Sequence, residues 1–305
     1  MRCLIIHNPA SGPSSDEIYA FTRALAQGGD EVVMRFIGDG MEPEDAVADV
    51  REFDRVVVSG GDGTVSNVLD QMRGCGVPTL IFPSGTACLF FNNIGNAPEA
   101  AALAKACRAG RTVKVDMGEL FWIDEDGNEK RHGFIIIAGS GYDAEIMMKA
   151  APTKNDIGEI AYFLSALATP NPTVAHFTIE HDGMVEELDG ICCMAGNTSV
   201  IQNDINLFPS CRMNDGMVDI VVIEPVRTVQ LLPTVITAAL DPAGKVLGRP
   251  QFKIIQTKEA KITCTPSLGM QFDGEIISSN SGVFGARALP QCLDLIVDEF
   301  SPLGK

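Results

Sequence analysis

An apolar run ends in a glycine-dense turn at residues 56–64, and this junction constrains the fold of the chain more than any other feature. Three valines are followed by Ser59, two glycines, Asp62, a third glycine and Thr64. Glycines without Cβ atoms let backbone N–H groups curl toward an anion, and the following helix adds its positive N-terminal end. The junction therefore predicts a phosphate site on an α/β fold, and an ordinary strand-to-helix turn is the alternative.

The first 115 residues alternate between strand and helix signals. Expected strands cover residues 3–7, 31–36, 55–59 and 79–82, and expected helices cover 64–72 and 98–108, with a short helix beginning near Pro43. Ser14 and Glu17 form a capping box before a helix whose Ile18, Phe21 and Leu25 share one face. This alternation is typical of a doubly wound parallel sheet, so residues 1–115 are expected to be an α/β domain.

From about residue 116 to residue 305 the pattern changes to two-residue alternation with hairpin turns. Asp126-Gly127 and Asp182-Gly183 are such turns, and they predict antiparallel β structure. Helical inserts are expected at 143–149, 157–167 and 228–240. No linker separates the halves, and the last residues are expected to return to the first domain.

Charge and cysteine content exclude several classes of protein. With 40 acidic and 23 basic residues, a net charge of −17 and an isoelectric point near 4.6, the chain is unsuited to nucleic acid or to electrostatic adsorption on anionic lipid. Any membrane substrate must be reached by a local surface. The nine cysteines lie partly in apolar runs and include no C-x-x-C pair, which indicates free thiols. Neither a signal peptide nor an 18-residue apolar run is found, so we expect a cytoplasmic protein without a transmembrane segment.

Three expected strands end in small, bendable loops: residues 8–12, 60–64 and 83–86. Parallel strands point the same way, so these loops should emerge at one edge of the sheet, where open α/β folds bind ligands. The G-x-x-x-x-G-K-[ST] motif is absent. Phosphate would therefore be held by backbone amides, by the hydroxyls of Ser11, Thr64 and Thr86, and by a divalent cation.

These motifs resemble the diacylglycerol kinase catalytic-domain family, which includes bacterial lipid kinases and sphingosine kinases within an NAD kinase-like superfamily. The resemblance is carried by Asn8-Pro9-x-Ser11-Gly12, Gly60 to Thr64, Pro83-x-Gly85-Thr86 and Asp273-Gly274-Glu275, with further landmarks at 115–118, 141–144, Asn197 and 214–219. It implies a nucleotide-binding α/β domain at 1–115, a β-sandwich lipid-substrate domain at 116–305, and an active site in the interdomain cleft.

The resemblance also implies a function, with ATP phosphorylating a hydroxyl of a diacylglycerol- or sphingoid-like lipid in phospholipid biosynthesis. Glu275 or Asp273 would be the base, Asp62 a further catalytic residue, and Asp215 with backbone oxygens near Arg212 and Met217 the magnesium site. The nucleotide site implied by the resemblance comprises Asn8, Pro9, Ala10, Ser11, Gly12, Gly60, Gly61, Asp62, Gly63, Thr64, Asn67, Gly85 and Thr86. Without the resemblance, Asp273-Gly274 and Asp215-Gly216 read as ordinary turns.

Departures from the family pattern leave alternatives open. Cys88, Leu89 and Asn92 stand where the family usually has Asn, Asp and Arg, and Asn67 stands where an acidic residue is common. A catalytically impaired nucleotide- or lipid-binding protein on the same scaffold is one alternative, and an NAD kinase-like enzyme is another. The expected partner is a lipid at a membrane surface, reached peripherally, and a homodimer is left open.

Overall fold

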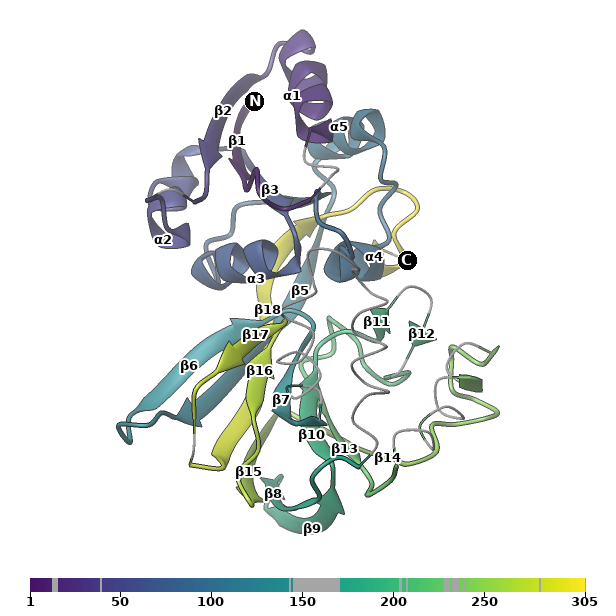
Figure 1. Cartoon of the computed structure of the whole chain (residues 1–305). Helices are drawn as coiled ribbons and strands as arrows, with labels where there is room; N and C mark the ends of the chain where they lie inside the picture. Colours follow the sequence, from purple (N-terminus) through teal and green to yellow (C-terminus); the bar gives the residue numbers. More distant parts are fainter. Residues whose placement is uncertain are drawn as a thin grey trace. The chain divides into compact units, whose positions relative to one another are not determined.

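The computed structural model divides the chain into two compact units. It describes residues 1–12, 16–38, 40–142, 144, 171–202, 205–206, 208–227, 231, 236–237, 240–279 and 281–304. Unit 1 consists of Met1–Asp116 and Pro290–Lys305, and unit 2 consists of Met117–Leu289 (Figure 1). Ser14, the expected helix at 157–167 and most of the residues of those at 143–149 and 228–240 lie outside the described residues.

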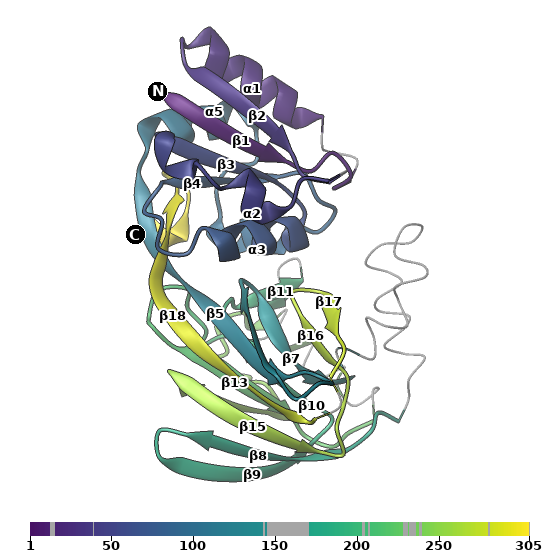
Figure 2. The same ribbon diagram turned by 90° about the vertical axis from the view of Figure 1, so that its left-hand side faces the viewer.

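Unit 1 is a parallel sheet with helices on both faces. Its elements are β1 (Arg2–His7), α1 (Glu17–Gln27), β2 (Glu31–Phe36), α2 (Pro43–Ala46), the 3₁₀ helix η1 (Val50–Glu52), β3 (Arg55–Gly60), α3 (Asp62–Gln71), β4 (Thr79–Pro83), α4 (Leu89–Ile94) and α5 (Ala100–Ala109). The strand order β2-β1-β3-β4 is parallel throughout. The helix α1 packs against α5 and α2 packs against α3, and the two pairs cover opposite faces (Figure 2). The expected doubly wound sheet is confirmed.

The central strands of unit 1 are apolar because both of their faces are covered. Cys3 to Ile6 of β1 and Val56 to Val58 of β3 are fully buried, and the expected helix face of Ile18, Phe21 and Leu25 is buried as well. Three expectations were wrong. The N-cap of α1 is Asp16, so Glu17 stands at the first helical position and not at the third, which the expected capping box with Ser14 requires. The helix α3 begins at Asp62 rather than Thr64, because Gly61 takes the extended N-cap conformation and the first helical turn tolerates Gly63. The six-residue helix α4 was not expected at all.

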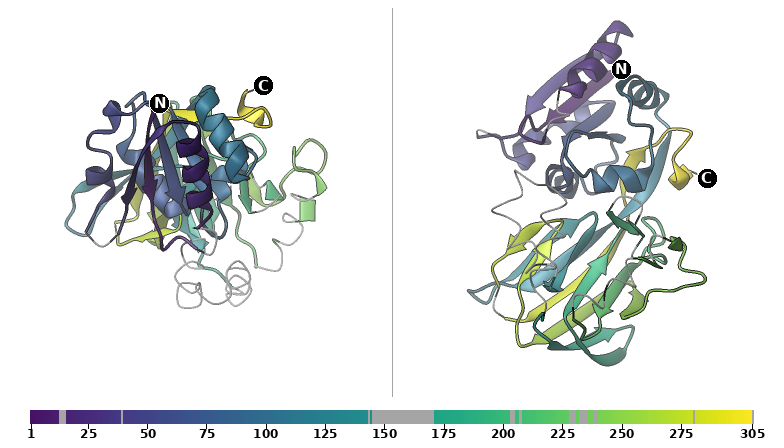
Figure 3. Two further views of the ribbon diagram at one scale, coloured as in Figure 1. Left: turned by 90° about the horizontal axis from the view of Figure 1, so that it is seen from above. Right: turned by 45° about the vertical axis from the view of Figure 1, so that its right-hand side comes forward.

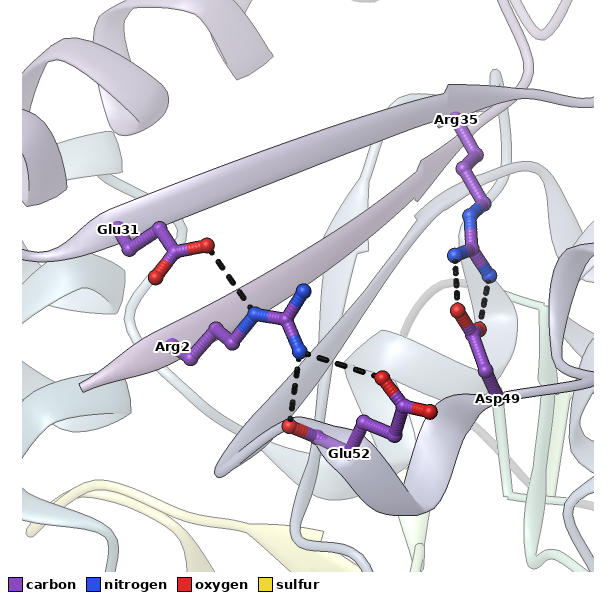
Figure 4. Close-up of polar contacts among 5 residues, drawn as sticks. All are labelled: Arg2, Glu31, Arg35, Asp49 and Glu52. Carbon is purple, nitrogen blue, oxygen red and sulfur yellow. Dashed lines mark hydrogen bonds and ion pairs between the residues drawn. The ribbon is translucent and has the colours of Figure 1, made fainter.

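Charged side chains fasten the edge strand β2 to its surroundings. The Arg2 guanidinium on β1 contacts Glu31 on β2 and Glu52 in η1, and Arg35 on β2 donates to both carboxylate oxygens of Asp49, at 2.5 and 2.7 Å (Figure 4). The two guanidinium groups also lie 4.5 and 5.7 Å from the centre of the Phe53 ring. Each exposed pair contributes little by itself, but charges along an open edge discourage pairing with another strand.

Unit 2 is an antiparallel β-sandwich. Its strands are β6 (Glu129–Phe134), β7 (Ile137–Gly141), β8 (Ala175–His181), β9 (Met184–Gly190), β10 (Cys192–Gly196), β11 (Val200–Gln202), β12 (Ile205–Asn206), β13 (Val218–Ile223), β14 (Phe252–Thr257), β15 (Glu259–Thr265), β16 (Met270–Phe272) and β17 (Glu275–Ile277). One sheet has the order β14-β13-β10-β7-β16-β17, and the other contains β15, β8 and β9 (Figure 3). The buried core includes Phe177, Ile220 and Ile262. The expected antiparallel half is confirmed.

Two long strands contribute residues to both units. The strand β5 (Thr112–Ile123) and the strand β18 (Val283–Ile296) pair with each other, and β18 also pairs with β15 and, through Leu295, with Thr79 of β4. The final segment then stays in unit 1, where the 3₁₀ helix η4 (Pro302–Gly304) ends the described chain. Within the described ranges, no helix has the length and apolar character needed to cross a bilayer.

Candidate functional site

The three glycine-containing loops of unit 1 meet at the carboxyl ends of β1, β3 and β4. A Cβ on Gly85 would lie 2.6 Å from the Cα of Gly61, and a Cβ on Gly12 would lie 3.2 Å from the carbonyl oxygen of Ser84. Gly12 has a φ of +132°, which L side chains rarely adopt. Each loop therefore needs a glycine where it touches the next, and the convergence predicted from the sequence is a set of direct backbone contacts.

Three buried polar side chains form a hydrogen-bonded row at the strand ends where these loops begin. The Nδ1 atom of His7 is 2.9 Å from the Ser59 hydroxyl, which in turn is 2.7 Å from the Ser84 hydroxyl. All three side chains are buried, and burial lowers the pKa of His7 below its ordinary value of 6.5. A neutral imidazole and two hydroxyls thus join the ends of three neighbouring strands and fix where their loops begin.

A hydrogen bond from the Asn8 side-chain amide connects the loop that follows β1 to α3. The Nδ2 group of Asn8 donates to the Thr64 hydroxyl at 2.8 Å, and the Asn8 Oδ1 atom accepts from the N–H of Ala10 at 3.0 Å. The hydroxyl oxygen of Ser11 is buried and has no hydrogen-bond partner among the described residues. A buried hydroxyl of this kind is a group that a bound ligand can satisfy.

Asp62 stands at the first position of α3 and caps a second helix. Its two carboxylate oxygens accept the N–H groups of Leu89 and Phe90, each at 3.0 Å. The carboxylate therefore supplies the N-terminal cap of α4 and ties the second glycine loop to the third.

The residue before α4 is the first of the three departures from the family pattern. Cys88 is in the left-handed region with a φ of +48°, and its thiol donates to the carbonyl of Gly85 at 3.2 Å. Burial, together with the charge of Asp62, raises the pKa of Cys88 to about 11. The thiol is therefore neutral near pH 7 and acts as a weak hydrogen-bond donor within the loop.

The far end of α4 is fastened by the C-terminal segment. The Ser301 hydroxyl donates to the Ile94 carbonyl at 2.6 Å, and a Cβ on Gly95 would lie 2.6 Å from Pro302. Asp298 accepts the N–H of Ala97 at 2.7 Å. Both ends of this helix are thus held by side chains that lie far from it in the sequence.

Asp273 of unit 2 accepts three backbone hydrogen bonds. The N–H groups of Ile135, Ile136 and Ile137 donate to its carboxylate at 2.7, 2.8 and 3.0 Å. Asp273 has a φ of +42° in the turn between β16 and β17, and its own N–H donates to the Ile137 carbonyl. This carboxylate holds the bend between β6 and β7.

Glu275 differs from Asp273 in its surroundings. It is exposed at the start of β17, where it is in register with Phe272 of β16. The buried amide side chain of Gln271 accepts the N–H of Gly274 at 3.1 Å and so fixes the turn between the two acidic residues.

The Asp215 turn precedes β13. The Asp215 carboxylate accepts the N–H of Met217 at 3.0 Å and the amide of Gln256 at 3.3 Å. The Arg212 guanidinium donates to the carbonyls of Pro209 and Cys211. The described residues contain no group of three His, Cys, Asp or Glu side chains suited to a metal, so a cation here would need backbone oxygens beside Asp215.

The buried acid near this turn was named in the sequence only as part of the landmark 214–219, without a role. Asp219 accepts from the Ser210 hydroxyl and from Gln256, and its pKa is raised, first by burial and further by the charge of Asp215. The apolar run 218–223 gave no signal for these partners. His7, Ser59 and Ser84 were also missed, although a polar residue at the end of each of three neighbouring strands is a usable signal.

Comparisons with known proteins match nearly the whole chain. The family model described as "Diacylglycerol kinase catalytic domain" matches residues 2–120, and "YegS C-terminal NAD kinase beta sandwich-like domain" matches residues 136–297. The diacylglycerol kinase of Bacillus subtilis is 26% identical over 292 residues, which are 90% of this chain and 89% of that protein. A diacylglycerol kinase of Mycobacterium tuberculosis is 28% identical over 243 residues, 75% and 73% of the two chains.

Solved structures show the same fold. A diacylglycerol kinase from Bacillus anthracis superimposes with a TM-score of 0.72 at 22% identity, over 98% of this chain and 97% of that one. Yeast NADH kinase in complex with NADH superimposes with a TM-score of 0.56 at 11% identity, over 98% and 84%.

Proposed function

Because the chain belongs to the diacylglycerol kinase catalytic-domain family, in the form with a YegS-type C-terminal domain, we propose that it is an ATP- and Mg²⁺-dependent lipid kinase. Its acceptor is the hydroxyl of a diacylglycerol- or sphingoid-like lipid. The observation that carries the proposal is the direct contact of Gly12, Gly61 and Gly85 at one edge of the sheet in unit 1. Such a backbone cradle suits phosphate, since no side chain keeps the anion from the amides.

In this proposal the loops of unit 1 bind the phosphates of ATP. The first turn of α3 presents backbone N–H groups that have no acceptor within the helix, and its dipole favours negative charge. The Ser11 hydroxyl, buried and unpaired among the described residues, gains a partner when phosphate binds. The proposed contacts also include Asn8, Thr64, Asn67 and Thr86.

Asp62 acts on this site through α4. Its carboxylate is used by the N–H groups of Leu89 and Phe90, so it sets the distance between the second and third loops. We assign it as a positioning residue rather than as a group that touches the nucleotide.

Glu275 rather than Asp273 is the proposed base. The Asp273 carboxylate accepts three N–H groups, which occupy three of the roughly four acceptor sites of a carboxylate. Glu275 is exposed and accepts the proton of the lipid hydroxyl as the oxygen bonds to the γ-phosphorus and ADP leaves. The carboxylate of Asp215 and the carbonyls of Arg212 and Met217 would hold Mg²⁺, because an all-oxygen set suits this cation. When bound, it would neutralise charge and order the turn.

The test is transfer of labelled phosphate from ATP to a panel of diacylglycerols, sphingoid bases and ceramides in mixed micelles. Glu275→Gln should lower kcat by about 100-fold or more with an unchanged unfolding midpoint. Glu187→Gln, another exposed glutamate on a strand of unit 2, is the matched control and should keep full activity. Equal activity of both variants would remove Glu275 from the mechanism, and no transfer to any lipid by the natural sequence would refute the lipid kinase.

One observation supports an alternative without turnover. Cys88 occupies a left-handed position and uses its neutral thiol inside the loop, so the third loop keeps its shape without the usual polar side chain. Tight ATP binding with no transfer to lipid or NAD would favour a non-catalytic binding protein. Phosphorylation of NAD would instead favour the NAD kinase-like alternative.

A further inference from the structure

One stretch of unit 2 reverses the charge of the rest of the chain. Residues 225–258 contain one acidic residue, whereas the whole chain has 40 acidic and 23 basic residues. The charged residues of this stretch are Asp241, Arg227, Lys245, Arg249, Lys253 and Lys258. A stretch with more basic than acidic residues, in a chain of net charge −17, is where a surface for an anionic partner is to be sought.

Within this stretch, the loop at residues 240–249 exposes large apolar side chains. Val246 is 85% exposed, Leu240 is 73% exposed and Leu247 is 46% exposed. Val246 is the most exposed large hydrophobic residue of the described chain. Exposed apolar side chains that lie within one short loop mark a candidate interaction site.

The loop is built to hold these side chains outward. Arg249 is only 8% exposed, and its guanidinium donates to the carbonyls of Asn206, Asp241 and Gly248 at 2.6 to 2.9 Å. The Asp241 carboxylate accepts the N–H groups of Val246 and Leu247 at 2.7 and 2.9 Å. A buried arginine and a capping carboxylate therefore fix the tip, so the exposure of the two apolar side chains is a property of the loop and not of a collapsed coil.

The charged residues near the tip also favour an anionic partner. The single acidic residue of the stretch is engaged by backbone N–H groups, which lower the pKa of Asp241. Lys253 pairs with Glu186, and Arg249 is buried, so Lys245 is the exposed cation beside Val246. An apolar tip flanked by a lysine is the pattern of a segment that enters the headgroup region of a bilayer.

We infer that the 240–249 loop docks this protein on an anionic phospholipid surface, with Val246 and Leu247 entering the bilayer and Lys245 contacting the headgroups. The inference rests on the proposed function, because a kinase for membrane lipids must reach its acceptor in the bilayer. A narrow tip with two or three apolar side chains suits a bilayer better than a protein partner, since stable protein interfaces bury about 800 Å² on each side.

The test measures binding of the full chain to sedimented vesicles of phosphatidylcholine and phosphatidylglycerol, without ATP or diacylglycerol. The variant Val246→Ser with Leu247→Ser should bind roughly 100-fold more weakly, from the loss of two inserted aliphatic side chains. Lys245→Glu should weaken binding by about 5-fold or more, and added salt should remove that difference.

The hairpin between β8 and β9 provides a matched control in the same unit. Met184 and Val185 are 55% and 61% exposed at its tip, but the hairpin is acidic, with Glu180, Asp182, Glu186, Glu187 and Asp189. Met184→Ser with Val185→Ser should bind vesicles as the natural sequence does. Unfolding midpoints of both double variants show whether each is folded.

A second measurement does not depend on those variants. Tryptophan placed at position 246 by Val246→Trp should be quenched by vesicles of brominated lipid, and Val185→Trp should not. Failure of the natural sequence to bind anionic vesicles, equal losses in the two double variants, or equal quenching at the two positions would overturn the inference. Concentration-dependent dimerisation that disappears in the 246/247 variant, with no vesicle binding, would assign the loop to a second copy and would also overturn it.

The outcome is distinguishable from that of the proposed function. A loop variant that keeps activity on a short-chain diacylglycerol in solution but loses it on vesicles supports both statements. Vesicle binding without any lipid phosphorylation would leave the docking loop in place and refute the kinase.

Discussion

Replacing Asp273 by alanine should destabilise unit 2 strongly, because three buried donors would lose their acceptor. The N–H groups of Ile135, Ile136 and Ile137 donate to this carboxylate, and all three isoleucines are buried. Each unsatisfied buried donor costs about 1–3 kcal/mol. Because water can enter and satisfy some of the three donors, we take the lower end of this range, about 3 kcal/mol for the three together. Alanine in a left-handed conformation adds about 1 kcal/mol. We therefore expect a loss of about 4 kcal/mol in the free energy of unfolding.

Asp182→Ala is the matched control, since Asp182 also has a left-handed backbone, with a φ of +47°, in a hairpin turn of unit 2. Its carboxylate contacts a histidine ring rather than backbone donors, so about 1 kcal/mol of strain is the expected loss. Urea unfolding is followed by the fluorescence of Trp122, the single tryptophan, whose ring lies 6.5 Å from that of Phe272 beside the altered turn. Losses within 1 kcal/mol of each other would refute the reasoning, because the three backbone bonds would then carry no net stability.

Three further predictions concern unit 1. Gly85→Ala places a Cβ 2.6 Å from the Cα of Gly61, so we expect the free energy of unfolding, followed by ellipticity at 222 nm, to fall by about 2 kcal/mol. ATP binding, measured by calorimetry, should weaken at least about tenfold. Unchanged binding would contradict the backbone cradle. Burial lowers the pKa of His7, so the unfolded chain takes up the proton first and the free energy of unfolding should fall as the pH drops below about 6.5. His7→Asn should make the free energy of unfolding less dependent on pH in this range. An unchanged pH dependence would contradict the buried, neutral imidazole. Asp62→Ala should speed hydrogen exchange at Leu89 and Phe90 by about 30-fold, measured by mass spectrometry, and equal protection would disprove the cap.

The parts of the fold that could be predicted are those set by local patterns. Apolar runs punctuated by glycine predicted β1, β3 and β4 and the loops after them, and Asp182-Gly183 predicted its hairpin, because strand period and turn chemistry act over a few residues. The resemblance to a known family then supplied the sandwich of unit 2, which periodicity alone described only as antiparallel.

The roles of the acidic residues could not be read from the sequence. Asp273 finds its donors 136 to 138 residues earlier in the chain, and Asp62 finds them 27 and 28 residues later. Only the folded backbone brings these groups together, so a capping carboxylate and a catalytic one look alike in the sequence. The helix α4 was missed for the same reason, since its ends are fixed by Asp62 and Ser301 and not by its own residues.

The route of β18 has a consequence for how this protein is made. Unit 1 needs residues from both ends of the chain: the Ser301 hydroxyl reaches the Ile94 carbonyl across 207 residues, while unit 2 is one continuous segment. During synthesis, all of unit 2 is therefore made before the end of β18 and the segment that contacts α4. Unit 1 stays incomplete until residues 290–304 have been made, so truncations within this segment should destabilise unit 1 more than unit 2.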